Sequence, residues 1–222
     1  MTRRVNDAWA ALRAWAAGAA GVAIDDAPFD QLRAYVEVLQ HWNARMALVS
    51  QREVEAILVK HVADSIFAAG RCGDAARIAD LGSGAGFPAV PIAILRPGTQ
   101  VCCFEATAKK VSFLAAARVA TGLRNLLVRE GRIETAATDA AHRESYDLAT
   151  SRALADLEPL RRLATPLLRP GGRLLAMRAA GLAVPAGAEV IEYRLPDGTP
   201  RELVMLGQAA VKVSVDGRSQ VQ

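Results

Sequence analysis

The sequence predicts an α/β fold, in which a mostly parallel β-sheet with helices on both faces follows an N-terminal helical segment. After residue 70, short apolar runs of strand length alternate with helical stretches, which predicts parallel strands joined by right-handed crossovers. Before residue 70, apolar residues recur only with the period of a helix. The 222 residues, 52% of them hydrophobic, suffice for one such domain and a small additional piece. We place the helical segment at residues 1–70 and the α/β domain at residues 71–222.

The N-terminal segment is expected to form three helices. Residues 1–24 are alanine-rich and begin with arginines. Residues 28–50 carry apolar side chains at helical spacing, Trp42 among them, and residues 53–70 repeat the pattern up to Gly70, a residue typical of helix ends. We interpret Trp42 as a core residue rather than a surface on which a base stacks.

Seven strands are expected to form the sheet. The five alternating strands are ARIADLG (76–82), QVCCFEA (100–106), NLLVREG (125–131), YDLATSRA (146–153) and GGRLLAMR (171–178). The helices between them are expected at 88–97, 109–122 and 156–171. A terminal hairpin, residues 188–196 and 201–209 around the turn DGTP, completes the sheet. This order is common among α/β methyltransferases with a Rossmann-like fold.

The turn ADLGSGAGFPAVP, residues 79–91, is the most informative stretch for ligand binding. An apolar strand runs through Asp80 into glycines at positions 82, 84 and 86. A dinucleotide fingerprint requires its last glycine where Phe87 stands, and a triphosphate loop requires a Gly-Lys-Ser or Gly-Lys-Thr that is absent. The remaining pattern, D-x-G-x-G-x-G, is typical of class I methyltransferases that bind S-adenosylmethionine (SAM). An NAD-dependent dehydrogenase is disfavoured by the glycine spacing.

Several residues around this turn are candidates for holding SAM. Glycines let the backbone approach a ligand closely, so we expect the backbone of Gly82, Gly84 and Gly86 to contact it. Asp80 is expected to hold the ammonium group of SAM or to order the loop. An acidic residue at the end of the next strand typically binds ribose hydroxyls, and Glu105 follows Gly82 by 23 residues, near the expected spacing. After the third strand, REGRIE offers two candidates for contact with the adenine, Ile133 and Glu134.

The turn after the fourth strand, TSRALADLEP (150–159), indicates the acceptor. It carries neither the Asn/Asp-Pro-Pro-aromatic motif of enzymes that methylate amino groups nor a cysteine nucleophile. An acceptor that is already nucleophilic at neutral pH, such as guanine N7, needs neither, because alignment supplies most of the catalysis. The pattern permits this acceptor without requiring it.

Composition narrows the other classes of function. The net charge of +4 fits a polyanionic partner without demanding one. The three cysteines have no C-x-x-C spacing, so neither a metal site nor a disulfide framework is expected, and we interpret Cys102 and Cys103 as core residues. The apolar run AWAAGAAGVAI is too short to cross a bilayer, so we expect a cytoplasmic protein with no membrane partner.

The sequence resembles the glucose-inhibited division protein B family, bacterial 16S rRNA (guanine-N7) methyltransferases. The stretches that carry the resemblance run in family order from about Trp42 to Arg178: HWNARMALVS, VKHVADSI, IADLGSGAGFPAVPIAILRP, KKVSFL, GRIE, TSRAL and PGGRLLAMR. It implies a SAM-dependent enzyme that methylates small-subunit rRNA within the 30S subunit or its precursor. The resemblance implies that SAM is contacted by Gly82, Phe87, Glu105, Ala106, Thr107, Ile133, Glu134 and Arg152.

The resemblance also implies basic residues for RNA binding and activity. The RNA-binding candidates are Lys109, Lys110, Arg132 and Arg178, and those that orient the acceptor are Arg152, Arg178 and Lys109. Lys110 stands where the family often has Arg, and Arg178 where it often has Lys, so charge is kept while hydrogen bonding differs. The family pattern W-N-x-x-x-N-L-T reads WNARMALV here, and Ala47 and Val49 replace polar residues.

Structural alternatives stand beside these functional interpretations. Arg152 can serve an ion pair, for instance with Asp156, and His61 with Asp64 can form a structural pair rather than a cover over the site. Lys109 and Lys110 oppose the helix dipole where they stand, which favours an anionic partner over a solvated pair. Two other functions remain open: a SAM-dependent methyltransferase with a small-molecule acceptor, and an RNA-binding assembly factor without turnover.

Overall fold

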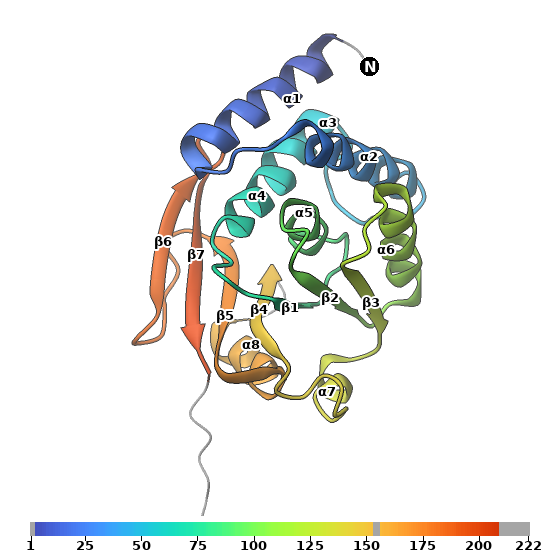
Figure 1. The fold of residues 1–222 in the computed structure, drawn as a ribbon. Coiled ribbons are helices and arrows are strands. Elements are labelled where there is room, and N and C mark those ends of the chain that lie inside the picture. The colour runs from blue at the N-terminus through green and yellow to red at the C-terminus, as the bar shows by residue number, and fades with distance from the viewer. Residues whose placement is uncertain (1–2, 153–155, 209–222) are drawn as a thin grey trace, which may run out of the picture.

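A seven-stranded sheet runs through the middle of the protein in this computed structural model, which describes residues 3–152 and 156–208 (Figure 1). The spatial order is β3-β2-β1-β4-β5-β7-β6. The strands are β1 (Arg77–Leu81), β2 (Gln100–Glu105), β3 (Leu126–Glu130), β4 (Tyr146–Arg152), β5 (Leu168–Ala179), β6 (Glu189–Arg194) and β7 (Pro200–Gly207). Strands β1 to β5 pair in parallel, and β7 pairs antiparallel with both β5 and β6. The predicted mostly parallel seven-stranded sheet with a terminal hairpin is confirmed.

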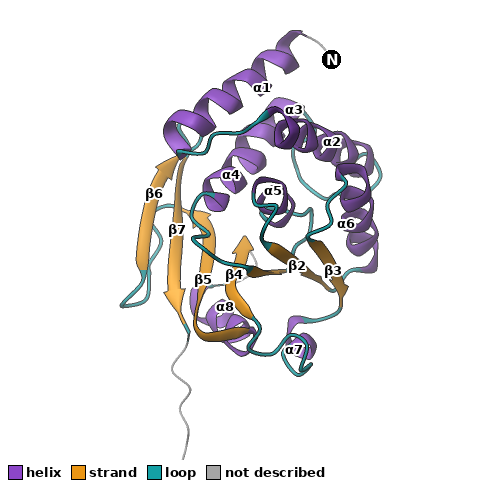
Figure 2. Cartoon of the chain, in the orientation of Figure 1, coloured by secondary structure: helices purple, strands orange, loops and turns teal. Residues whose placement is uncertain are grey.

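Helices cover both faces of the sheet (Figure 2). Their bounds are α1 (Arg3–Trp15), α2 (Asp26–Asn43), α3 (Val54–Ile57), α4 (Ala63–Ala69), α5 (Ala89–Leu95), α6 (Ala108–Thr121), α7 (Ile133–Ala136) and α8 (Leu157–Ala164). Two π-helical turns, η1 (Ala16–Ala20) and η2 (Leu58–Val62), and one 3-10 turn, η3 (Thr165–Leu167), adjoin them. Helices α7 and α8 lie on one side of the sheet, and α1 to α6 lie on the other (Figure 1).

The hydrophobic core consists of two clusters, one on each face of the sheet. Alternation along a strand divides them: in β1, Ile78 joins the cluster under α1 to α6, and Ala79 joins the cluster under α7 and α8. Trp42 packs against Phe113 of α6, as expected for a core residue. The N-terminal helices and the sheet share the first cluster, so the two parts of the chain bury their apolar side chains against each other.

Several expected elements differ in extent. The helix expected at 53–70 is interrupted by η2, where the N–H of Ala63 bonds to the carbonyl oxygen of Leu58. The helix expected at 156–171 ends by Leu167, because the chain pairs with β4 from Leu168 onward. The short helix α7 was not expected. Residues 153–155 and 209, within the predicted fourth strand, the turn after it and the hairpin, lie outside the described residues.

Asn43 ends α2 well before the predicted limit at residue 50. Its side-chain oxygen accepts hydrogen bonds from the backbone N–H groups of Leu48 and Val49, at 2.9 and 3.0 Å, and its side-chain nitrogen donates to the carbonyl of Gln51 at 3.0 Å. These local bonds compete with helical ones and turn the chain toward α3. Because Val49 takes part through its backbone, its apolar side chain does not disturb the turn.

Gly86, in the turn between β1 and α5, has no room for a side chain. Its φ is +84°, and an added Cβ would lie 2.7 Å from Cγ2 of Val90 and 3.2 Å from the hydroxyl of Tyr35. That hydroxyl donates a hydrogen bond to the carbonyl of Ala85 at 2.5 Å, so α2 lies directly against the turn. The third glycine of the turn is therefore required for packing as well as for backbone conformation.

We predict that Gly86→Ala lowers the free energy of unfolding by about 2–4 kcal/mol, because it combines an unfavourable φ with overpacking. Urea denaturation measures the change. Gly98→Ala is the matched control, since a Cβ at Gly98 meets nothing within 4 Å and its φ is not positive. Equal stability of the two variants would contradict the packing argument.

Candidate functional site

The glycine turn lies where the strand order reverses. β2 lies on one side of β1 and β4 on the other, and the chain leaves the carboxyl end of β1 through residues 82–88 into α5. In open α/β sheets, ligands bind at such a switch point, outside the carboxyl ends of the strands. The N–H groups of Gly82 and Ser83 donate to the carbonyl of Phe104, at 2.9 and 3.1 Å, which holds the start of the turn against β2.

Glu105 connects the glycine turn to the turn after β2. One carboxylate oxygen accepts a hydrogen bond from the N–H of Gly84 at 2.9 Å, and the other accepts one from the N–H of Thr107 at 2.8 Å. Glu105 is only 6% exposed. A carboxylate offers about four acceptor positions, so two bonds leave capacity for the hydroxyls of a ligand.

A cavity of about 350 Å³ opens beside Glu105 at the carboxyl ends of β1, β2 and β3. We call it the donor cavity. Its volume is within the range of small-molecule sites. It brings together seven residues predicted for SAM or RNA, namely Gly82, Glu105, Ala106, Lys110, Arg132, Ile133 and Glu134. Sequence reasoning missed three further lining residues, Phe104, Gly131 and Leu163, because nothing in their local pattern separates them from ordinary core or turn positions.

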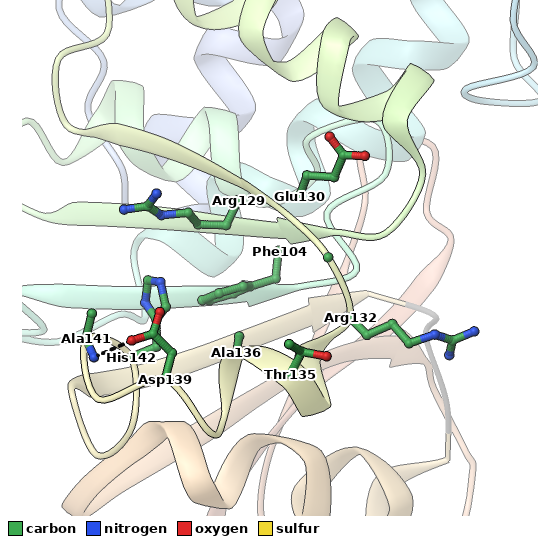
Figure 3. A pocket seen from close by; sticks show the side chains of 10 residues that line it. Phe104, Arg129, Glu130, Arg132, Thr135, Ala136, Asp139, Ala141 and His142 are labelled. Carbon is green, nitrogen blue, oxygen red and sulfur yellow. Dashed lines mark hydrogen bonds between the residues drawn. The ribbon is translucent and has the colours of Figure 1, made fainter.

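A hollow of about 240 Å³ adjoins the donor cavity, and Figure 3 shows the side chains that line it. The two share Phe104, Gly131 and Arg132. His142 lies in this hollow, and its Nδ1 is 2.7 Å from the hydroxyl of Tyr146. In Figure 3, the guanidinium of Arg132 points away from His142. The hollow therefore widens the region around β3 in which a ligand can contact the protein.

Phe87 and Arg152 lie in a contact layer between the glycine turn and the N-terminal helices. The guanidinium of Arg152 lies 5.1 Å from the ring centroid of Phe87, and the ring of His61 stacks on Phe87 at the same centroid distance. Nη1 of Arg152 donates to Nδ1 of His61 at 2.7 Å. The proton of that imidazole is then at Nε2, which donates to Oε1 of Gln51 at 2.6 Å.

Asp64 anchors this layer. Its carboxylate accepts two bonds from Arg201 of β7, at 3.2 and 2.9 Å, and one from the hydroxyl of Tyr193 of β6. Nη1 of Arg152 lies 3.9 Å from the same carboxylate. Arg152 thus pairs with Asp64 of α4 rather than with Asp156, the partner considered from the sequence.

Asp80 is buried between β1 and β4. Its carboxylate accepts a hydrogen bond from the hydroxyl of Thr150 at 2.8 Å. Burial raises the pKa of Asp80 to about 6, although hydrogen bonds and the positive charge of Arg152 oppose the shift. The carboxylate therefore joins β1 to β4 inside the sheet, two residues before Gly82.

The predicted basic residues occupy different environments. Lys109 is exposed at the start of α6, and Arg132 is exposed beside the donor cavity. Arg178 is largely enclosed: Nε donates to Oε1 of Glu202 at 2.5 Å, and the two terminal nitrogens donate to the carbonyls of Leu182 and Ala183. The structure therefore does not gather the predicted basic residues into one cluster.

A second cavity, of about 630 Å³, lies at the carboxyl ends of β4 and β5. We call it the acceptor-side cavity. Its walls are Ser151, Asp156, Leu157, Leu160, Ala176, Met177, Arg178, Ala179, Leu182 and Arg201. Helix α8 borders both cavities, since Leu163 lines the donor cavity and Leu160 lines the second one.

The three cysteines lie in the core of the protein. Cys72, Cys102 and Cys103 are buried and free, which confirms the core assignment of the adjacent pair. Within the described ranges, no group of three or more His, Cys, Asp or Glu side chains is arranged to hold a metal ion. In that same part of the chain, no helix combines the length and apolar character needed to cross a bilayer.

Residues 29–194 match the model of the GidB family, described as rRNA small subunit methyltransferase G. The chain belongs to the GidB family. Two relatives named ribosomal RNA small subunit methyltransferase G support the assignment. The one from Roseiflexus sp. (strain RS-1) is 35% identical, over 89% of this chain and 88% of its own length. The one from Deinococcus deserti is 38% identical, over 86% and 85% of the two chains.

Solved structures agree on the fold. A methyltransferase from Geobacter sulfurreducens superposes with a TM-score of 0.55 and 13% sequence identity, over 78% of this chain and 87% of the other. Together with the strand order, this confirms the Rossmann-like methyltransferase fold predicted from the sequence. The strand order places the glycine turn and Glu105 at the carboxyl edge of the sheet, where open α/β folds bind ligands.

The burial of His61 makes the stability of the protein depend on pH. Burial, together with the positive charges of Arg152, Arg201 and Lys60, lowers the pKa of His61 to about 3. In the unfolded chain the imidazole titrates near 6.5, so between these values the unfolded state binds the extra proton. Stability contributed by neutral His61 is therefore present at pH 7 and is lost as the pH falls from about 6.5 toward 3.

We predict that His61→Gln destabilises the protein at pH 7 and that its difference from wild type shrinks at lower pH. The change is at most about 1.4 kcal/mol per pH unit. Urea denaturation at several pH values measures it, with His41→Gln, at an exposed position on α2, as the matched control. Parallel pH curves for wild type and His61→Gln would refute the linkage.

Proposed function

We propose that this chain transfers a methyl group from SAM to N7 of a guanine in 16S rRNA, acting in the cytoplasm on the 30S subunit or its assembly precursor. The observation that carries the proposal is the match of residues 29–194 to a family described as rRNA small subunit methyltransferase G. The donor cavity supports it, since the glycine turn and Glu105 meet there at the switch point of the sheet.

The residues around the donor cavity fit SAM, which supplies an electrophilic methyl group on a sulfonium when bound. In this proposal, backbone groups of Gly82, Gly84 and Gly86 approach the amino-acid part of SAM. Glu105 accepts hydrogen bonds from the ribose hydroxyls of SAM. The remaining contacts are assigned to the turns after β2 and β3, through Ala106, Thr107, Ile133 and Glu134. The absence of a lysine from the turn fits a ligand without phosphate.

Three further residues are assigned to the donor site through the glycine turn. Asp80 orders the turn from inside the sheet, which its burial and its bond to Thr150 favour over direct contact with the ammonium group. Phe87 ends the turn, and Arg152 and the N-terminal helices pack against its ring. In this proposal, Arg152 supports the conformation of the turn and orients the acceptor from the carboxyl end of β4.

The acceptor atom requires little chemistry from the protein. N7 of guanine carries a free lone pair, so no base has to remove a proton before transfer. The cysteines are unsuited to nucleophilic catalysis, because burial raises the pKa values of Cys72, Cys102 and Cys103. Catalysis by orientation is therefore the role proposed for this chain, with Lys109, Arg152 and Arg178 as the orienting residues.

Basic residues at and near the donor cavity fit an RNA partner. Lys110 and Arg132 line the cavity, and Lys109 directly precedes Lys110 on α6; we propose that they bind phosphates of the rRNA. Such contacts position the RNA, whereas the base itself is recognised at the acceptor site.

The proposed reaction is tested with labelled SAM and 30S subunits from a strain that lacks this enzyme. We expect label in 16S rRNA and chain cleavage at N7-methylguanosine after borohydride and aniline treatment. Label without cleavage would move the acceptor to another atom. If neither label nor cleavage is found, the proposal is excluded. RNA binding without methyl transfer would identify an assembly factor. Negligible affinity for the subunit would favour a small-molecule acceptor.

We predict that Glu105→Gln weakens SAM binding by at least about tenfold, because a neutral amide accepts hydrogen bonds less strongly than a carboxylate. Isothermal titration calorimetry measures the dissociation constant. Glu192→Gln is the matched control, since Glu192 is an exposed glutamate of β6, at the opposite edge of the sheet from β3. Unchanged affinity of Glu105→Gln would refute the ribose role.

A further inference from the structure

The acceptor-side cavity has the chemical character of a nucleobase site. Leu157, Leu160 and Met177 are buried in its wall, while Ser151 and Asp156 add polar oxygens. A flat base has apolar faces and polar edges, and sites for such ligands combine apolar walls with a few polar groups. The cavity of about 630 Å³ exceeds the donor cavity of about 350 Å³.

This cavity is adjacent to the donor cavity. The hydroxyl of Ser151 donates to the carbonyl of Leu81 at 3.1 Å, and Leu81 directly precedes Gly82 of the donor cavity. On α8, Leu160 and Leu163 border the two cavities, and three residues of helix advance about 4.5 Å. The two cavities are therefore neighbours along α8.

The loop between β5 and β6 borders the acceptor-side cavity through Leu182 and exposes apolar side chains. Leu182 lines the cavity and is 56% exposed, and Val184 is 42% exposed. These are two of the four large hydrophobic side chains that are exposed within the described ranges. An apolar side chain at the mouth of a cavity gains free energy when a ligand covers it.

Arg178 and Glu202 hold this loop in place. The guanidinium of Arg178 donates to the carbonyls of Leu182 and Ala183, while Glu202 accepts from Arg178 at 2.5 Å and from the N–H of Gly181 at 3.3 Å. The side chains of Arg178 and Glu202 are 15% and 4% exposed. The charge of Arg178 is thus paired internally and is not directed at a phosphate.

We propose that the acceptor-side cavity receives the acceptor guanine, that Leu182 packs against the base, and that Arg178 acts as a positioning residue through its hold on the loop at residues 180–188. This inference rests on the proposed function and adds the place where the base binds. It also replaces direct RNA contact by Arg178 with an indirect role.

The contribution of Leu182 is tested by Leu182→Asp, with Val119→Asp as the matched control. Val119 is 80% exposed on α6, so both substitutions introduce the same charge at an exposed aliphatic position. We expect Leu182→Asp to lower kcat/KM for 30S subunits by at least about tenfold and to leave the SAM dissociation constant within about twofold of wild type. Equal kcat/KM for the two variants would overturn the assignment.

The indirect role of Arg178 is tested by Glu202→Gln, which removes the charged partner of the guanidinium. If Arg178 holds the loop, the loosened loop lowers kcat/KM for 30S subunits, and Arg178→Gln does the same. If Arg178 contacts rRNA directly, releasing it from Glu202 lowers KM, and that result would overturn the indirect role. SAM affinity and thermal unfolding monitor the fold of both variants, and the exposed position of Leu182 keeps its own test independent of folding.

The two levels of the proposal fail differently. If wild-type protein forms no N7-methylguanosine, the proposed function is wrong. If wild-type protein forms it and Leu182→Asp, Arg178→Gln and Glu202→Gln retain wild-type kcat/KM, only the assignment of the acceptor cavity is wrong.

Discussion

The buried carboxylate of Asp64 is the constraint on which the arrangement of this protein depends. Asp64 is only 1% exposed, and a buried negative charge requires hydrogen-bond donors and positive charges around it. Arg201 of β7, Tyr193 of β6 and Arg152 of β4 supply it. One side chain of α4 therefore fixes the N-terminal helices against both the parallel strands and the terminal hairpin. Removing one member of such a buried group typically costs about 3–5 kcal/mol.

The helices held in this way also support the glycine turn. Arg152 reaches His61 on one side and Phe87 on the other, and the hydroxyl of Tyr35 bonds to the carbonyl of Ala85. The glycine turn is thus supported from behind by α2 and η2, while Glu105 holds its other side. A π-helical turn at η2 places Lys60 and His61, and such turns are frequent at functional sites. The helical segment thereby holds the glycine turn in its conformation, in addition to its packing.

Basic side chains occupy two kinds of environment in this GidB-family protein. Arg152 and Arg178 hold internal elements together, because their guanidinium groups are bonded to protein atoms. Lys109 and Arg132 remain exposed near the donor cavity, where their charge is available to RNA. A planar guanidinium donates in several directions at once, so Arg178 joins a carboxylate and two backbone carbonyls. The proposed acceptor site uses this property, since Arg178 shapes a loop that presents Leu182.

The sequence by itself determined the strand and helix alternation, the glycine turn and the position of Glu105 at the end of the second strand. These depend on local periodicity, on backbone freedom at glycines and on fixed spacing along the chain, all of which short stretches encode. Element ends were less predictable, because Asn43 ends α2 through bonds to residues several positions ahead, and Leu168 joins the sheet by pairing with Tyr146. Only the tertiary structure decided that Arg152 pairs with Asp64, that Arg178 serves the β5–β6 loop, and that two cavities adjoin along α8. Such partners come from segments far apart in the sequence, and the residue type of an arginine does not specify which of them it meets.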